Sequence, residues 1–155
     1  MKKTVSIFIL LLLPVVAFSQ VTYEEIMSIN SIDTFKRVAI ENGYSKEEGM
    51  GKDDQIIYSL NSETNADKES LAEAYCVYST STDNYLFIFG KAEVKFFDTY
   101  EDIISDIKEK CTYNKIMSHL GNDYVAYDCP YSKYKGKIGF ARIEGDGYVI
   151  HLVDN

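Results

Sequence analysis

The sequence predicts an α+β fold made of two tandem units, each a helical hairpin followed by three antiparallel strands. Apolar residues recur at helical spacing in two separate regions, and short alternating runs follow each of them. Glycine, asparagine and aspartate residues separate these runs, as expected for tight turns. Residues 20–155 provide enough chain for a single domain, with repeats expected at 22–97 and 98–155.

The first 19 residues are typical of a cleavable signal peptide. Lys2 and Lys3 give a basic start, an apolar run extends from Val5 to Phe18, and small residues end at Ser19. The run is shorter than the roughly 20 residues that cross a bilayer as a helix. We therefore expect a secreted or periplasmic protein that begins near Gln20 and has no membrane span after cleavage.

The net charge of the expected mature chain limits the kinds of molecule that it can bind. Without the two lysines of the signal peptide, 14 basic residues stand against 24 acidic ones, so the net charge is −10. Nucleic-acid binding depends on clustered Lys and Arg, and the nearest approach to a cluster is Lys133, Lys135 and Lys137 in one expected loop. The sequence therefore predicts no nucleic-acid partner.

Two short helices are expected at the start of the domain. Thr22 and Glu25 have the spacing of a capping box, which starts a helix that runs to about Ile29. Asp33 is the expected cap of the second helix, and Gly43 permits a left-handed C-cap at its end. Strands are then predicted at Gln55–Leu60, Ala72–Ser79 and Tyr85–Phe89, the last continuing past a bulge at Gly90 as far as Phe97.

The second half repeats this order. Asp98 begins a helix whose apolar face carries Tyr100, Ile103, Ile104, Ile107 and Cys111. Thr112 is the expected cap of a further helix with Tyr113, Ile116, Met117 and Leu120 on one face, closed by Gly121. Strands follow at Tyr124–Cys129, Lys137–Ile143 and Tyr148–Val153, the last two joined by a Gly145-Asp146-Gly147 turn.

Some residues agree between the halves. The segment Thr22–Ile26 matches Thr99–Ile103, and Gly43 matches Gly121. This element order resembles the architecture of the β-lactamase-inhibitor-protein family. The resemblance implies one joined sheet with helices on one face and an open concave face, which in that family is similar to a docking platform for another protein.

The three cysteines allow one disulfide and one remaining thiol. Cys76 lies in an apolar strand pattern and is expected to be an inert core thiol. Cys111 and Cys129 end a helix and a strand, and they can pair if the fold brings their Cα atoms within roughly 4.4 to 6.8 Å.

No cofactor or metal site is predicted. His119 and His151 are the only histidines, and neither has a further ligand at zinc-site spacing. We expect His151 to be a hydrogen-bonded structural residue in the last strand, and His119 to lie near a helix end. Glu47-Glu48 and Asp53-Asp54 offer carboxylates for glycoside cleavage or calcium binding, but adjacent acids in a glycine-containing loop are usually solvated.

Tyrosine is the unusual residue, with 13 in the chain and no tryptophan. Tyrosine suits a half-wet sheet face and is enriched at protein interfaces, although it also packs well across strands. Tyr75 and Tyr78 have opposite parity, so a shared face for both requires a bulge. The expected binding residues are Tyr58, Tyr75 or Tyr78, Tyr85, Tyr127 and Tyr148.

These patterns favour a non-enzymatic binding protein that contacts a protein or peptide through a Tyr-bearing sheet face. One alternative is a structural or accessory protein of the cell envelope whose tyrosines belong to the core. Another is a small hydrolase of an envelope polymer that uses Asp and Glu residues. No catalytic residue is predicted, because no nucleophile-and-base motif occurs.

Overall fold

The computed structural model describes most of the chain after the expected signal peptide. The described residues are 20–64, 70–90, 94–119, 121–143 and 147–153. The expected signal peptide, the strand extension at residues 91–93, Leu120 and the Gly145-Asp146 turn lie outside them.

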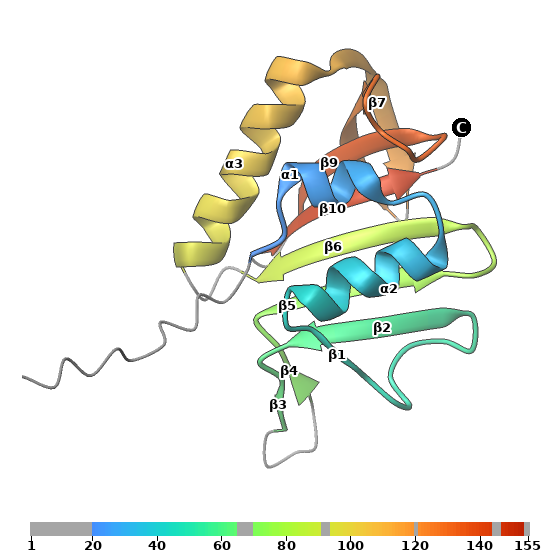
Figure 1. The fold of residues 1–155 in the computed structure, drawn as a ribbon, viewed down its shortest axis with the longest axis vertical. Helices are drawn as coiled ribbons and strands as arrows, with labels where there is room; N and C mark the ends of the chain where they lie inside the picture. Colours follow the sequence, from blue (N-terminus) through green and yellow to red (C-terminus); the bar gives the residue numbers. More distant parts are fainter. Residues whose placement is uncertain (1–19, 65–69, 91–93, 120, 144–146, 154–155) are drawn as a thin grey trace, which may run out of the picture.

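The described residues form an α+β fold with three helices and one eight-stranded antiparallel sheet (Figure 1). The helices are α1 (Tyr23–Ser28), α2 (Ile32–Glu41) and α3 (Val94–Lys110). In sheet order, the strands are β1 (Ser45–Lys46), β2 (Gln55–Leu60), β5 (Ala74–Ser79), β6 (Asn84–Gly90), β10 (Gly147–Val153), β9 (Lys137–Ile143), β8 (Asn122–Asp128) and β7 (Thr112–His119). A small separate ribbon pairs β3 (Glu63–Thr64) with β4 (Ser70–Leu71).

The sheet consists of two meanders joined at their last strands. β1, β2, β5 and β6 follow one another across one half, and β7, β8, β9 and β10 do so across the other. β6 and β10 pair antiparallel, with Phe89 opposite Tyr148 and Tyr85 opposite Leu152. Each half therefore contributes four strands to the sheet, where the sequence predicted three.

All three helices lie on the same side of the sheet (Figure 1). Phe35 of α2 is buried against Tyr58, Tyr85 and Phe87, so α2 covers the first half of the sheet. Tyr100 of α3 packs on aromatic rings of β6 and β10. The main hydrophobic core is the layer between these helices and the sheet.

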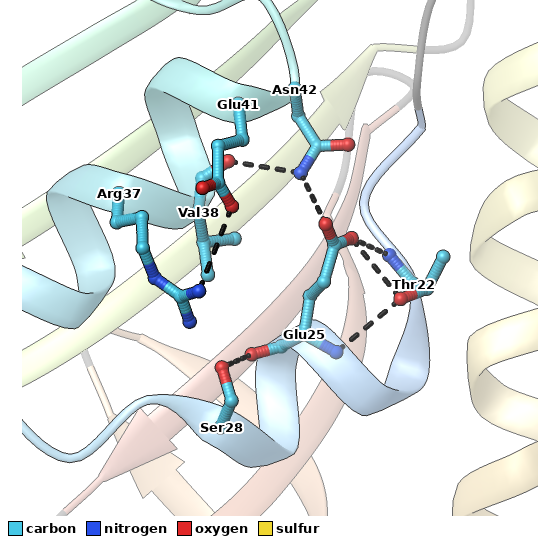
Figure 2. A network of polar contacts seen from close by, with 7 residues as sticks. All are labelled: Thr22, Glu25, Ser28, Arg37, Val38, Glu41 and Asn42. Atoms are coloured by element: carbon cyan, nitrogen blue, oxygen red, sulfur yellow. Dashed lines mark hydrogen bonds and ion pairs between the residues drawn. The ribbon is translucent and has the colours of Figure 1, made fainter.

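The first helix begins as predicted, and one residue of its cap also holds the second helix. Thr22 and Glu25 form the expected capping box. Figure 2 shows the other carboxylate oxygen of Glu25 accepting a hydrogen bond from the amide of Asn42, which ends α2. The predicted cap at Asp33 is wrong. The N-cap is Ser31, whose Oγ accepts from the backbone of Thr34, because a hydroxyl two residues earlier reaches the free N–H groups of the first turn.

The long helix α3 starts a turn earlier than predicted. It begins at Val94 rather than at Asp98, so the predicted continuation of the preceding strand to Phe97 is wrong. Phe96 and Phe97 stand four and three residues before Tyr100, so the helical period of the apolar residues extends back through them. A short run of β-prone residues could not be distinguished from the first turn of this helix by composition.

The helix predicted after Thr112 is wrong, because residues 112–119 form the edge strand β7. Seven of its residues pair with β8, from Thr112 opposite Asp128 to His119 opposite Asn122. Aromatic and β-branched residues favour a strand once a partner strand is present. The second half of the fold consequently has one helix where the first has two.

Candidate functional site

Most of the tyrosines proposed as a binding surface belong to the core. Tyr58 and Tyr85 are buried beneath α2, and the ring of Tyr78 stacks on that of Tyr85 with centroids 4.9 Å apart. The hydroxyl of Tyr78 reaches the rim of this layer and donates to Asp83, 3.0 Å away. Burial raises the pKa of the Tyr85 phenol, because the phenolate would lose its hydration.

The tyrosines of the second half follow the same pattern. Tyr148 is buried against Tyr100 of α3, and half-buried Tyr127 stacks on Phe140 on the helix-covered side. Only Tyr75, among the six expected binding residues, has the strand parity of the open side. The expected common open face is therefore wrong. Tyrosine fills this core because its ring packs while its hydroxyl reaches a polar edge.

The cysteines lie in two different environments. Cys111 and Cys129 form a disulfide with their Cα atoms 4.4 Å apart, which joins the end of α3 to the residue that follows β8. Cys76 is a free thiol in the core. Burial raises the pKa of its thiol well above the ordinary value, so it stays protonated and unreactive.

Two of the acidic loop residues accept hydrogen bonds from serine hydroxyls within the fold. Glu47 accepts a hydrogen bond from the hydroxyl of Ser59, and Asp54 accepts one from Ser81. The loop that contains them borders an open cavity of about 590 Å³. Glu47 therefore connects the start of this loop to β2, and Asp54 connects its end to the turn between β5 and β6.

The two histidines meet on the side of the sheet that the helices leave open. His119 ends β7 rather than lying near a helix end, and His151 lies in β10; their ring centroids are 4.8 Å apart. β10 and β7 are separated by two strands, a distance of about 14 Å in a flat sheet. The sheet must therefore curl toward its open side here, which makes this face concave.

Other side chains fill the space around this pair. Tyr124 of β8 packs edge-on against His151, with centroids 5.2 Å apart. The methyl group of Met117 lies 3.7 Å from the position that a Cβ on Gly139 would take, and Gly139 is the residue opposite His151 in β9. We call Met117, His119, Tyr124 and His151 the concave-face cluster.

His151 differs from its predicted role. Its side chain is 0 % exposed, and neither ring nitrogen has a hydrogen-bond partner among the described residues. Burial, and secondarily the nearby His119, lower the pKa of His151 to about 4, so the ring is neutral at pH 7. A buried polar group without a partner costs about 1–3 kcal/mol. The presence of an unpaired histidine at this buried position therefore needs an explanation.

The sequence did not indicate the cluster, because its histidines belong to strands far apart in the chain. Only the pairing of β7 with β8, which replaced a predicted helix, brings them together. Within the described part of the chain, no group of three or more His, Cys, Asp and Glu side chains is arranged to hold a metal. The described helices include none with the length and apolar composition needed to cross a membrane.

A second exposed feature lies on the helix-facing side of β7. Tyr113 and Ile116 are 54 % and 53 % exposed, although large apolar side chains are usually buried. Tyr113 lies opposite Tyr127 and Ile116 lies opposite Val125, both of which are half-buried. We call these four residues the β7 edge patch.

No protein-family model matches the chain, and comparisons with curated proteins and with solved structures likewise give no match. The resemblance in element order noted from the sequence therefore stays a prediction.

Proposed function

We propose that the protein is an exported, non-enzymatic binding protein, and that it contacts an extended segment of another protein along β7. The observation that carries this proposal is an eight-residue strand at the edge of the sheet with two large apolar side chains exposed on one face. An edge strand offers a row of backbone N–H and C=O groups to an incoming strand.

The two edges of the sheet differ in what they offer. β1, at the other edge, is only two residues long and its residues are exposed and polar. β7 has room for a partner segment of several residues, and Tyr113 and Ile116 can contact side chains at alternate positions of that segment. Backbone pairing would supply affinity, and the two side chains would supply selectivity.

A β-bulge produces the apolar face of β7. Tyr113 and Ile116 are three positions apart, so a regular strand would place them on opposite faces. The register shifts between Tyr113 and Lys115, which leaves Asn114 as an extra residue and brings both apolar side chains to one face. The amide of Asn114 donates to Asp128 on β8 and so anchors the bulge.

The charge of the protein favours a different protein over a second copy. The expected mature chain carries a net charge of −10, so two copies repel each other. A basic partner would be attracted, with an association rate that falls as salt is added. We therefore commit to an extended, apolar segment within a basic protein.

Export is part of the proposal. The basic start and apolar run of residues 1–19 support it, and so does the disulfide between Cys111 and Cys129, because disulfides persist mainly in oxidising compartments. Tyr127 is the one residue of the originally expected tyrosine surface that belongs to the β7 edge patch.

Photo-crosslinking in the cells that express the protein tests this proposal. A photoreactive residue at position 116 should capture one partner, whereas the same residue at position 40 should not. Ile40 is the matched control because it is an isoleucine 61 % exposed on α2, away from β7.

The captured protein is then purified and its affinity measured by calorimetry. Ile116→Asp should weaken binding at least tenfold, about 1.4 kcal/mol, while Ile40→Asp leaves the affinity unchanged. Backbone amides of β7 should gain protection from hydrogen exchange in the complex. The proposal is wrong if position 116 captures nothing, if both positions capture the same protein, or if Ile116→Asp binds as tightly as the wild type.

A further inference from the structure

We propose that Met117, His119 and His151 bind a single Cu(I) ion on the concave face of the sheet. This inference rests on the concave-face cluster and is independent of the β7 edge patch, which lies on the opposite face of the sheet. The three side chains offer two imidazole nitrogens and one thioether sulfur.

Strand geometry puts the three groups on the same face. Met117 and His119 are two residues apart in β7, so their side chains point to the same side. The ring contact between His119 and His151 shows that this is also the side of His151. Asp123, which pairs with Ser118, has the opposite parity and accepts a hydrogen bond from that serine, so no carboxylate enters from this turn.

The distance between the two imidazole rings suits a shared ion. Two imidazoles whose nitrogens lie about 2.0–2.1 Å from one metal, with an angle near tetrahedral, place their centroids roughly 5 Å apart. The centroids of His119 and His151 are 4.8 Å apart and the rings are tilted by 55°. Binding requires one nitrogen of each ring to point to a common position between them.

His151 has properties expected of a metal ligand. Its nitrogens have no hydrogen-bond partner among the described residues and no exposure to water. An imidazole nitrogen that has no hydrogen-bond partner can give its lone pair to a metal ion. A metal ion would satisfy a nitrogen that is otherwise desolvated without compensation.

The thioether of Met117 lies next to Gly139. An added Cβ there would come within 3.1 Å of the Cβ of Tyr124 and 3.7 Å of the Met117 methyl group. The 3.7 Å separation is an ordinary van der Waals distance, so the Met117 methyl group extends from β7 to the side of Gly139. Gly139 is the residue paired with His151, which places the thioether on the same part of this face as His151. Half-buried His119 and Met117 form the accessible side of the site.

The donor set selects the ion. Thioether sulfur is a soft ligand that favours Cu(I), and imidazole binds copper as well. Calcium and magnesium require oxygen ligands, and a structural zinc site usually has four ligands drawn from Cys, His and carboxylates. Two imidazoles and one thioether therefore fit Cu(I) better than these ions.

Competition for Cu(I) with a chromogenic chelator tests the site on protein purified from cells that express the full chain. A Cys76→Ala background is used alongside the wild type, because a thiolate also binds Cu(I). One equivalent of Cu(I) should bind in both. Met117→Leu should weaken affinity at least tenfold, and His119→Gln should weaken it more.

Met50→Leu is the matched control, because Met50 lies in the loop before β2 and should have no effect. Circular dichroism establishes that each variant is folded, and Met117→Leu keeps the volume of the side chain nearly constant. Nuclear magnetic resonance should show Cu(I) shifting the Met117 methyl signal and the ring signals of both histidines.

The proposal is overturned if folded wild-type protein binds no Cu(I), or if Met117→Leu and His119→Gln bind it as tightly as the wild type. It is also overturned if Zn(II) binds more tightly than Cu(I) and its affinity is unaffected by Met117→Leu. Loss of binding in Cys76→Ala alone would assign the copper to the core thiol instead.

Discussion

His151 is the residue whose chemistry most clearly depends on its surroundings. It lies between Val149 and Val153 on the open face, as strand alternation predicts, yet the curl of the sheet buries it completely. The groups with ionisable protons that face it are His119 from β7 and Tyr124 from β8. Without a bound ion, the protein must hold this ring neutral, and this requirement links its stability to pH.

Stability should therefore fall as the pH is lowered from about 6.5 to about 4. The pKa of His151 is about 4 in the folded protein and 6.5 when exposed, so the unfolded chain binds the proton more readily in this range. The stabilising effect of the neutral ring is complete above pH 6.5 and is lost as the pH falls. Between pH 7.5 and pH 4.5 the difference amounts to about 2.5 kcal/mol. Urea unfolding at pH 7.5 and pH 4.5, with a metal chelator present, measures it.

Substitution separates this effect from the titration of carboxylates. Between the two pH values, His151→Leu should lose about 2.5 kcal/mol less stability than the wild type. His119→Gln should keep most of the loss, because burial is the larger cause of the lowered pKa and remains in place. An equal pH dependence in the wild type and in His151→Leu would show that His151 is not the group responsible.

Among the elements, α1 depends on Glu25, whose two carboxylate oxygens accept hydrogen bonds from two different segments. Thr22 donates its backbone N–H to Glu25 Oε2 over 2.8 Å, which closes the capping box. Asn42 donates to Glu25 Oε1 over 3.0 Å and to the carbonyl of Val38 over 2.9 Å (Figure 2). A helix of six residues is too short to be stable alone. Its position therefore depends on this connection to α2 and on burial of its apolar face.

Glu25→Ala should destabilise the protein by about 1–2 kcal/mol, because it removes half of a capping box and one hydrogen bond to a buried amide. Thermal and urea unfolding measure the change. Glu24→Ala is the matched control, since Glu24 is in the same first turn but makes only an exposed ion pair with Lys110, which should contribute little. Equal losses in the two variants would refute a special role for Glu25.

Local signals predicted most elements, and tertiary context decided the exceptions. The Thr22 capping box, the Gly43 C-cap at φ 83° and the strand Lys137–Ile143 are all present. The segment after Thr112 carries apolar residues that fit either a helical or an extended period. Its secondary structure is set by pairing with β8. The sequence pattern of the eight residues of β7 alone does not reveal this pairing.

The same limit applies to the candidate sites. The parity of His151 was readable from its strand, but its contact with His119 depends on the curl of four strands. Likewise, Tyr113 and Ile116 share a face only because of the bulge at Asn114. The tyrosine-rich strands were identified correctly, but which side the helices cover was fixed by Phe35 and its neighbours, not by tyrosine itself.

For the whole molecule, one sheet joins two halves that carry different numbers of helices. The meanders are alike in strand order, and they meet at β6 and β10 in the middle of the core. α2 covers the first half, whereas at the far end of the second half Tyr113 and Ile116 stay exposed. The uneven cover leaves the β7 edge patch available on one face and the concave-face cluster on the other.

The disulfide connects the helical layer to the sheet at the end of α3, where the helices stop covering the second half of the sheet. Cys111 follows the last turn of α3, and Cys129 follows β8, so the bond holds the helix against the β7 and β8 hairpin. The hydroxyl of Tyr23 from α1 lies 3.7 Å from Cys111 Sγ, which brings the first helix to the same point. Loss of the bond should loosen the connection between the helices and the second meander.

Replacing both cysteines, Cys111→Ala with Cys129→Ala, should lower the free energy of unfolding by about 3 kcal/mol. The bond closes a loop with a sequence separation of 18 residues, and this size of loop restricts the unfolded chain by about that amount. The measurement is urea unfolding of the wild type and the double variant, each with and without dithiothreitol.

Reduction should destabilise the wild type to the level of the double variant and leave the double variant unchanged, because Cys76 forms no disulfide. If reduction weakens both proteins equally, the effect comes from elsewhere. The same bond connects the fold to the proposed export. In a reducing compartment the chain would lack this stabilisation and hold β7 and β8 less firmly against α3. The edge strand and the His119 end of the concave-face cluster would then be less well ordered, so oxidation would support both proposed binding surfaces together.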